Sequence, residues 1–344
     1  MQNGSWRTLT LMLACLPAWT GCLEQSDREV VVYTALDREF SESILSDVGE
    51  ELQLQIRPKF DQESNKTVGL ANEILRRQQR PVTDLFWNNE ILHTLRLQRA
   101  GLLEPMNISR LEAWPDSYRS SSDTWIGFAA RARILIVNTD LVPPERMPQS
   151  IFDLADPKWK GKCAMAKPLF GTSATHAAVL MAELGVEEGQ QRLAEMLQNA
   201  SVVGGNKQVA TGVSEGRFAF GLTDTDDAMV EIEQGKPVTI VFPDQADDQL
   251  GTLLIPNTIA LIQNGPQTQL ARQVLDRLVR SDIEVRLEQG SSAQLPLDPE
   301  WKGTWRVLKH AQVDDSFKRM SVDFEAAADE WDRAEAWVQQ LLER

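Results

Sequence analysis

Cysteine is scarce in this chain of 344 residues, which contains only Cys15, Cys22 and Cys163. We expect Cys15 to be removed with an N-terminal targeting segment and Cys22 to be modified directly after it. Cys163 then has no partner for an intrachain disulfide. The count also excludes a zinc or redox site built on cysteine. The sequence has no GxSxG, HExxH, CxxC or P-loop pattern, and its three histidines stand in no catalytic pattern. We therefore do not expect an enzyme.

Positive charge is also in short supply, because 35 basic residues face 50 acidic ones and the formal net charge is −15. Such a surface repels nucleic-acid phosphates and anionic lipid heads, which argues against a nucleic-acid partner. It is weakly consistent with a cationic ligand. Hydrophobic residues make up 42% of the chain and charged residues 25%, as in soluble globular proteins. The length allows about two domains of roughly 150 residues each.

Long apolar runs are missing except near the N-terminus, where residues 9–19 follow Arg7. This run is too short to span a bilayer and is typical of a signal peptide. It ends at Thr20-Gly21-Cys22, which resembles a lipoprotein cleavage site. We expect a signal peptide at residues 1–21 and lipidation of Cys22, so that only a lipid anchor contacts the membrane. Simple signal cleavage, or an uncleaved anchor, remains the alternative.

Strand-like and helix-like segments alternate along the rest of the chain, which predicts a doubly wound α/β fold. The predicted strands are residues 29–34, 52–58, 83–87, a buried strand within 125–142, and residues 162–166, 218–222, 237–242 and 252–262. The predicted helices are residues 37–49, 64–77 (with Ser64 as N-cap), 91–99, 172–184, 186–198, 208–214, 225–234, 267–279, 283–288 and 316–342. No internal repeat interrupts this order.

Several motifs occur in an order and spacing that together are specific, although each alone is weak. They are VYT at residues 32–34, TDLFWNNE at 83–90, GLL at 101–103, WIGFAARARILIVNTDLV at 125–142, DPKWKGK at 156–162, GTSATH at 171–176 and GLTDTDDA at 221–228. In this order they resemble the periplasmic iron-type solute-binding proteins, which are the extracytoplasmic receptors of ABC importers. The resemblance covers residues 30–297.

The resemblance implies an α/β, two-lobed type II periplasmic-binding-protein fold, in which each lobe has a mixed, mostly parallel sheet flanked by helices. A ligand cleft lies between the lobes, which close about a hinge. We expect one lobe from residues 29–127 plus about 253–290, and the other from about 128–252 plus about 291–344. The expected protein is a periplasmic or cell-surface monomer that needs no cofactor and docks to an ABC permease. A sensor subunit that docks to a receptor kinase is an alternative.

One departure from the resemblance concerns the ligand. Iron-binding members carry two adjacent tyrosines after the strand that matches residues 218–222, whereas this chain has Asp224, Asp226 and Asp227 there. Its two tyrosines, Tyr33 and Tyr118, are far apart. The aspartates are suited to a hard cation or an ammonium group, and they follow a strand at the edge where α/β sheets bind ligands. Helix capping is the competing interpretation.

Other polar residues are expected to face the same cleft. The hydroxyls at residues 172–175 begin a helix and suit an anion, or act only as caps. The resemblance places an acidic metal ligand of the relatives at or near Glu90. The alternative is that residues 88–90 only form the turn and cap the helix that follows. The further ligand-binding candidates are Tyr33, Thr34, Asp37, Asn88, Asn89, Arg131, Thr172, Ser173, Thr175 and Asn206. The candidate metal ligands are Glu90, Asp224, Asp226 and Asp227.

The function predicted from these observations is a solute receptor that closes on a metal cation, iron-like and paired with an anion. The alternative is the same receptor binding a small charged organic solute, such as a phosphonate, an amine or a carboxylate.

Overall fold

The computed structural model describes residues 28–61, 68–108, 112–311 and 313–343. The predicted signal peptide, the predicted lipidation site Cys22 and the predicted cap Ser64 lie outside these residues. In the ranges that the structure describes, no helix has both the length and the apolar character needed to cross a membrane.

The strands form a sheet path in the order β2-β1-β3-β10-β5-β8-β6-β7, with β4 paired to β10 and β9 paired to β5. Strands β1, β2 and β3 are parallel to one another, as are β6, β7 and β8, while β5 and β10 run antiparallel to their neighbours. The bounds are β1 Glu29–Thr34, β2 Gln55–Phe60, β3 Leu85–Asn88, β4 Leu103–Glu104, β5 Trp125–Asn138, β6 Cys163–Ala166, β7 Ser201–Val203, β8 Phe220–Asp224, β9 Val238–Val241 and β10 Leu254–Ile262.

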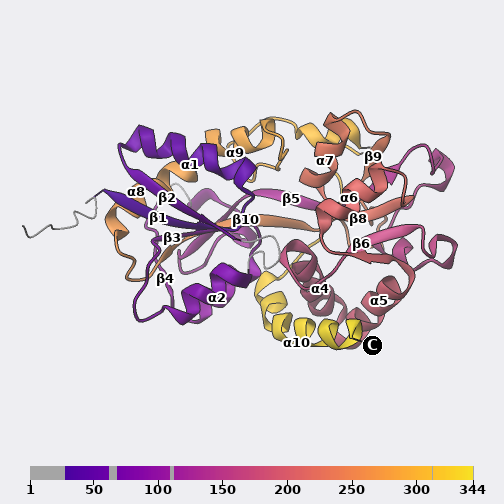
Figure 1. Cartoon of the computed structure of the whole chain (residues 1–344), viewed down its shortest axis with the longest axis horizontal. Helices are drawn as coiled ribbons and strands as arrows, with labels where there is room; N and C mark the ends of the chain where they lie inside the picture. Colours follow the sequence, from indigo (N-terminus) through magenta and orange to yellow (C-terminus); the bar gives the residue numbers. More distant parts are fainter. Residues whose placement is uncertain (1–27, 62–67, 109–111, 312, 344) are drawn as a thin grey trace, which may run out of the picture.

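Helices cover both faces of each half of this sheet, and Figure 1 shows the two resulting lobes side by side. The helices are α1 Arg38–Leu52, α2 Val68–Arg76, α3 Leu92–Arg99, α4 Gly171–Leu184, α5 Val186–Asn199, α6 Asn206–Ser214, α7 Thr225–Glu233, α8 Thr268–Leu278, α9 Ser281–Gln289 and α10 Phe324–Leu342. We call the half with β1–β4, α1–α3 and α8 the first lobe. The half with β6–β9 and α4–α7 is the second lobe.

The long strand β5 joins the lobes, because its first part pairs with β10 and its second part with β8 and β9. All its residues are buried, which agrees with the mostly apolar sequence of the segment, and the two arginines at 131 and 133 are the buried charges within it. The strand runs without a break across the predicted boundary between residues 127 and 128. The exact division into lobes therefore stays a prediction.

A bulge marks the junction between the lobes. The register of β5 and β10 shifts between Pro256 and Asn257, and Ala129 opposite them has a φ of +47°. The buried carboxylate of Glu284, on α9, accepts a hydrogen bond of 2.5 Å from the Ala129 N–H and further bonds from the N–H groups of Leu297 and Asp298. Bulges bend strands, so this one sets the angle at which β5 enters the second lobe.

Most predicted boundaries differ from the observed ones by one to three residues, and two differences have a clear physical cause. The strand predicted to start at residue 52 starts at residue 55, because α1 continues to Leu52 and ends on Gln53 in the left-handed conformation. The first eight residues of the helix predicted at 316–342 are not helical. This segment instead exchanges backbone hydrogen bonds with Thr252, and α10 begins only after Asp323, whose side chain caps the Ala326 N–H at 3.0 Å.

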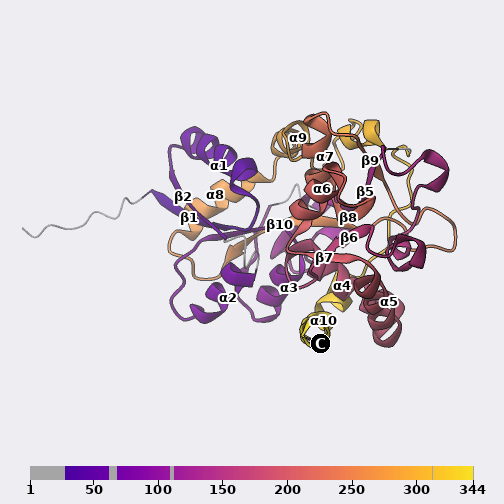
Figure 2. The same cartoon turned by 45° about the vertical axis from the view of Figure 1, so that its right-hand side comes forward.

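Helix α10 contacts both lobes. It packs along α4 of the second lobe and against α3 of the first, and Figures 1 and 2 both show it beneath the molecule at this junction. The ring centroids of His93 and Trp331 are 4.5 Å apart, and Arg99 pairs with Glu325 and Asp329. The predicted assignment of this helix to the second lobe alone is not tested by these contacts and stays a prediction.

Candidate ligand-binding site

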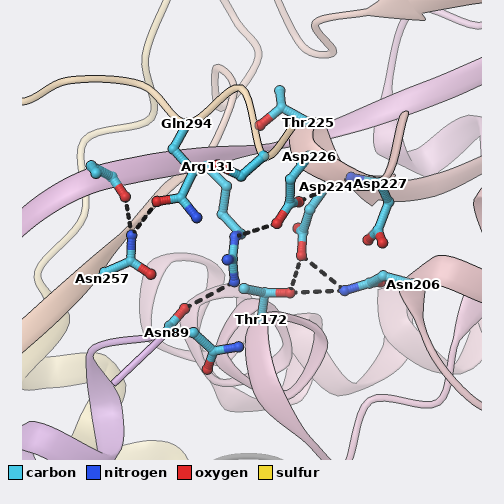
Figure 3. Close-up of polar contacts among 12 residues, drawn as sticks. Asn89, Arg131, Thr172, Asn206, Asp224, Thr225, Asp226, Asp227, Asn257 and Gln294 are labelled. Carbon is cyan, nitrogen blue, oxygen red and sulfur yellow. Dashed lines mark hydrogen bonds and ion pairs between the residues drawn. The ribbon is translucent and has the colours of Figure 1, made fainter. Parts of the chain in front are cut away.

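Three aspartates gather where β8 ends and α7 begins. Strand β8 includes Asp224 as its last residue, so Asp226 and Asp227 fall in the first turn of α7. One carboxylate oxygen from each lies within 4.8 Å of the others, and Figure 3 shows the three side chains together. Oxygen ligands at this spacing suit a hard cation. The predicted aspartate group is therefore assembled in the fold.

Asp224 occupies the N-cap position of α7, but its side chain makes no capping hydrogen bond. Its Oδ1 atom instead lies 2.7 Å from Nη1 of Arg133. Its Oδ2 atom accepts from Oγ1 of Thr172 at 2.5 Å and from Nδ2 of Asn206 at 2.9 Å. Both carboxylate oxygens are thus bound within the second lobe, and the capping interpretation of Asp224 is wrong.

Arg133 is the centre of this buried network. Besides Asp224, its guanidinium donates to Oδ1 of Asn206 at 3.1 Å, to Oγ of Ser173 at 3.4 Å and to Nδ1 of His176 at 3.4 Å. Burial, together with the neighbouring Arg133 charge, lowers the pKa of His176 to about 3, so its imidazole is neutral at ordinary pH. The hydroxyls of α4 predicted to hold an anion bind protein partners here.

Arg131 lies two residues earlier on the same face of β5 and reaches across the junction. Its Nε atom is 3.1 Å from Oδ2 of Asp226, and its Nη1 atom donates to the backbone oxygen of Asn89 at 3.2 Å. Burial alone would lower the pKa of Arg131, but nearby carboxylates, with Asp226 foremost and Asp37 among them, outweigh burial and raise it. The predicted residues Asn89, Arg131 and Asp226 therefore come together, with Asp37 close by.

Glu90 lies outside the aspartate group and is 0% exposed. One oxygen accepts from Nδ2 of Asn88 at 2.6 Å and the other from Oγ1 of Thr175 at 3.1 Å. Its carboxylate also accepts from the N–H groups of Leu92 and His93 in the first turn of α3. Burial raises its pKa, although these hydrogen bonds oppose the shift. Glu90 thus bonds to the N–H groups at the start of α3, as the alternative interpretation predicted. Its bond to Thr175 links the two lobes. Metal binding by Glu90 stays a prediction.

Tyr33 is not brought to the aspartates. Its hydroxyl donates to Oε1 of Glu73 at 2.9 Å and lies 3.5 Å from Nζ of Lys59. Burial, followed by the Glu73 carboxylate, raises the pKa of Tyr33, so its phenolate form is disfavoured. Thr34 points to the other face of β1, where its buried hydroxyl accepts from the Leu36 N–H at 3.2 Å. Ligand binding by either residue stays a prediction.

Three polar residues near the aspartates were not among the predicted site residues. Thr225 accepts a hydrogen bond of 3.2 Å from the Ala132 N–H, and Asn257 donates to Oε1 of Gln294 at 2.8 Å. Figure 3 shows all three around Arg131 and the aspartates. Asn257 had a sequence signal, because it interrupts an apolar strand. Gln294 had none, since it lies in a segment for which no element was predicted.

Comparison with known proteins identifies the family of the chain. The family model described as "Bacterial extracellular solute-binding protein" matches residues 88–326. The chain is 26% identical over 204 residues to an Fe(3+)-binding periplasmic protein of Serratia marcescens, covering 57% of each chain. It is 26% identical over 223 residues to iron uptake protein A2 of Synechocystis, covering 59% of this chain and 63% of the relative. The matches thus span about three fifths of these relatives.

The fold is also found among solved structures. A ferric binding protein from Campylobacter jejuni superposes with a TM-score of 0.80 at 20% identity, and the match covers 91% of this chain and 99% of that one. At this identity the likeness concerns the fold alone, and it confirms the predicted two-lobed α/β architecture.

Proposed function

The chain belongs to the bacterial extracellular solute-binding proteins, and we propose that it is the receptor of an ABC importer for a ferric-type metal cation. The family match agrees with the resemblance inferred from the motifs, and this family consists of solute-binding receptors rather than enzymes. The ligand is the proposed part. It follows the iron-binding relatives and the chemistry of the aspartates.

The observation that carries the proposal is the grouping of the three aspartate carboxylates within 4.8 Å at the junction of the lobes. Hard, multiply charged cations prefer such oxygen ligands. In this proposal Asp226 and Asp227 supply the ligand oxygens. Asp224 orients the start of α7 through its bonds to Arg133, Thr172 and Asn206, and it joins the metal only by exchanging one of them.

The burial of Arg131 supports a partner anion beside the proposed metal. A cation that takes Asp226 leaves the guanidinium of Arg131 without its counter-ion, and an unpaired buried charge costs about 3–5 kcal/mol. An oxyanion that binds both the cation and Arg131 restores the pairing. The site therefore exchanges an arginine–aspartate pair for a metal–anion pair.

Closure of the lobes is proposed to trap this ligand. The polar contacts that cross the junction include Arg131 to the Asn89 oxygen and Thr175 to Glu90. Asp224 and Asp226 are only 3% and 6% exposed, so a ligand reaches them when the lobes separate. We further propose a periplasmic or cell-surface monomer that is anchored through Cys22 and docks to a permease.

The test is thermal unfolding and calorimetric titration of the purified protein with Fe³⁺ and phosphate, carbonate or citrate. Mn²⁺, Ca²⁺ and 2-aminoethylphosphonate are titrated in parallel. A bound ligand at 100 times its dissociation constant adds about 2.7 kcal/mol to the free energy of unfolding. The Asp226→Asn/Asp227→Asn variant should lose the Fe³⁺ response. Its matched control is Asp247→Asn/Asp248→Asn, an adjacent aspartate pair that is exposed and should respond as wild type does.

Two results would overturn the proposal. The first is an Fe³⁺ response that survives in the Asp226/Asp227 variant, which would remove the aspartates from the site. The second is a response to 2-aminoethylphosphonate without a response to any metal, which would make the ligand a small organic ion bound on the same scaffold.

A further inference from the structure

Gln294 is a buried carboxamide that lies opposite Arg131. Ala130 and Leu295 form an antiparallel bridge, with N–H to oxygen distances of 2.8 and 2.7 Å. The next residue on each side, Arg131 and Gln294, therefore face each other, and in an antiparallel pair such residues project their side chains to the same face. Figure 3 shows the Gln294 carboxamide on the Arg131 side of the network.

The orientation of this carboxamide is determined by Asn257. The Asn257 amide nitrogen donates to the backbone oxygen of Ala129, which fixes it as a donor toward that side. It also contacts Oε1 of Gln294 at 2.8 Å. Because a donor needs an acceptor, Gln294 must turn its oxygen toward Asn257 and its nitrogen away from it.

The nitrogen of Gln294 then has no hydrogen-bond partner among the described residues, although the residue is 0% exposed. Buried donors of this kind are rarely left without an acceptor in a folded protein. A second donor group, the guanidinium of Arg131, lies across from it. Two donors that project from neighbouring segments of the chain to the same face suit an acceptor oxygen between them, and an anionic one in particular.

We propose that Gln294 is a further ligand-binding residue, which together with Arg131 donates hydrogen bonds to an oxygen of the bound oxyanion. This inference deepens the proposed function and rests on its requirement for a partner anion. The ligand class is a small oxyanion with at least two acceptor oxygens, such as a carbonate, a phosphate or a carboxylate. In this proposal the positive charge of Arg131 attracts the oxyanion. The N–H donor of Gln294 favours a ligand atom that accepts a hydrogen bond over one that donates.

The experiment titrates phosphate, carbonate and citrate, each with and without Fe³⁺, into the full-length protein and two variants. Gln294→Glu keeps an oxygen for Asn257 but replaces the donor by a negative charge. Gln294→Met removes the polar group at nearly constant volume. The matched control is Gln79→Glu, an exposed glutamine in the turn after α2. Circular dichroism and thermal unfolding of each ligand-free variant establish that it is folded.

We expect both Gln294 variants to bind the oxyanion roughly tenfold or more weakly than wild type, with Gln294→Glu the weaker, because a lost hydrogen bond to a charged group has about this effect. The control should bind as wild type does. Equal affinity in either folded variant would overturn the inference and would assign the carboxamide to a buried water only. So would wild-type protein that binds no oxyanion in either condition.

The two proposals fail separately. If Fe³⁺ changes nothing but an oxyanion binds wild type and is weakened in the Gln294 variants, the metal assignment fails and the role of Gln294 holds. If Fe³⁺ and an oxyanion bind together with no difference between wild type and the variants, the metal assignment holds and the role of Gln294 fails.

Discussion

Two buried arginine–aspartate pairs stand side by side in this protein and differ in what surrounds them. Arg133 and Asp224 are bound by side chains from α4 and α6, all within the second lobe. Arg131 pairs with Asp226 of the second lobe but also donates to Asn89 of the first. Both arginines come from one strand face, so sequence spacing alone does not separate them.

The difference assigns the two pairs different roles. A pair that is fully hydrogen-bonded inside one lobe keeps its contacts whether the lobes are open or closed, so it acts as a framework for the start of α7. The pair of Arg131 and Asp226 also contacts the first lobe, so its contacts change when the lobes separate. Its interaction free energy therefore depends on closure and on the ligand. Loss of the first should therefore affect folding, and loss of the second should affect closure.

The largest effect is expected from Asp224→Ala, which breaks the framework pair. Removing one partner of a buried pair leaves Arg133 charged and unpaired, so we expect the free energy of unfolding to fall by about 3–5 kcal/mol. Urea unfolding measures it. The control is Glu42→Ala, which breaks an exposed pair with Arg38 and should change stability by at most about 1 kcal/mol. A similar small change for Asp224→Ala would contradict the framework role.

The framework pair can also be compared with a buried carboxylate whose hydrogen bonds come from backbone N–H groups. Glu284 accepts hydrogen bonds from backbone N–H groups at the bulge, and burial raises its pKa from 4.5 to about 7, against these bonds and with a small contribution from Asp298. Between these values the folded protein holds a proton that the unfolded chain has lost, so stability falls as pH rises from 4.5 to about 7.

This shift corresponds to roughly 3 kcal/mol. In Glu284→Gln the titration is removed, so the stability difference between wild type and variant should change by about that amount between pH 4.5 and pH 8. Urea unfolding at several pH values measures it. The amide of the Glu284→Gln variant also turns an N–H toward the backbone N–H donors, which lowers stability. Because this loss is the same at every pH, it does not affect the change in the stability difference with pH. A difference that does not vary with pH would show that Glu284 is ionised in the folded protein throughout.

Much of this arrangement was predictable from local patterns. The alternation of strands and helices predicts the α/β fold, and Asp224 to Asp227 were found because they follow a buried strand, where parallel sheets place their ligands. The strand alternation of Tyr33 and Thr34 already implies opposite faces, which is why both cannot reach one cleft.

The remaining features depend on contacts between distant segments. Arg133 meets Asp224 across 91 residues of sequence, and nothing local tells whether an aspartate is neutralised in this way. Gln294 reaches the site only through the bridge between Ala130 and Leu295. Residues 316–323 have a helical pattern, yet pairing with Thr252 takes precedence over it. Tertiary contacts of this kind override local preference without leaving a sequence signal.

A smaller effect is expected from Arg131→Lys, which changes the pair between the lobes. Lysine keeps the charge near Asp226 but lacks the planar fork that reaches Asp226 and Asn89 together. We expect a loss of about 1–2 kcal/mol in the closed state, seen as a larger radius of gyration in small-angle X-ray scattering, with and without Fe³⁺. In the control Arg133→Lys the unfolding free energy should fall while the radius of gyration stays at the wild-type value. An equal radius of gyration for Arg131→Lys and Arg133→Lys would contradict the different roles of the two arginine–aspartate pairs.

The smallest and sharpest comparison uses two threonines in the first turn of α4. Thr175 donates to Glu90 of the first lobe at 3.1 Å, whereas Thr172 donates to Asp224 within the second lobe. Thr175→Val should weaken closure by about 1 kcal/mol, because it removes one hydrogen bond across the junction, and scattering should detect more of the open form. Thr172→Val should lower the urea midpoint by a similar free energy and leave the dimensions unchanged. If the two variants had interchangeable effects, closure would not depend on polar contacts between the lobes, and the separation into a framework pair and a closing pair would fail with it.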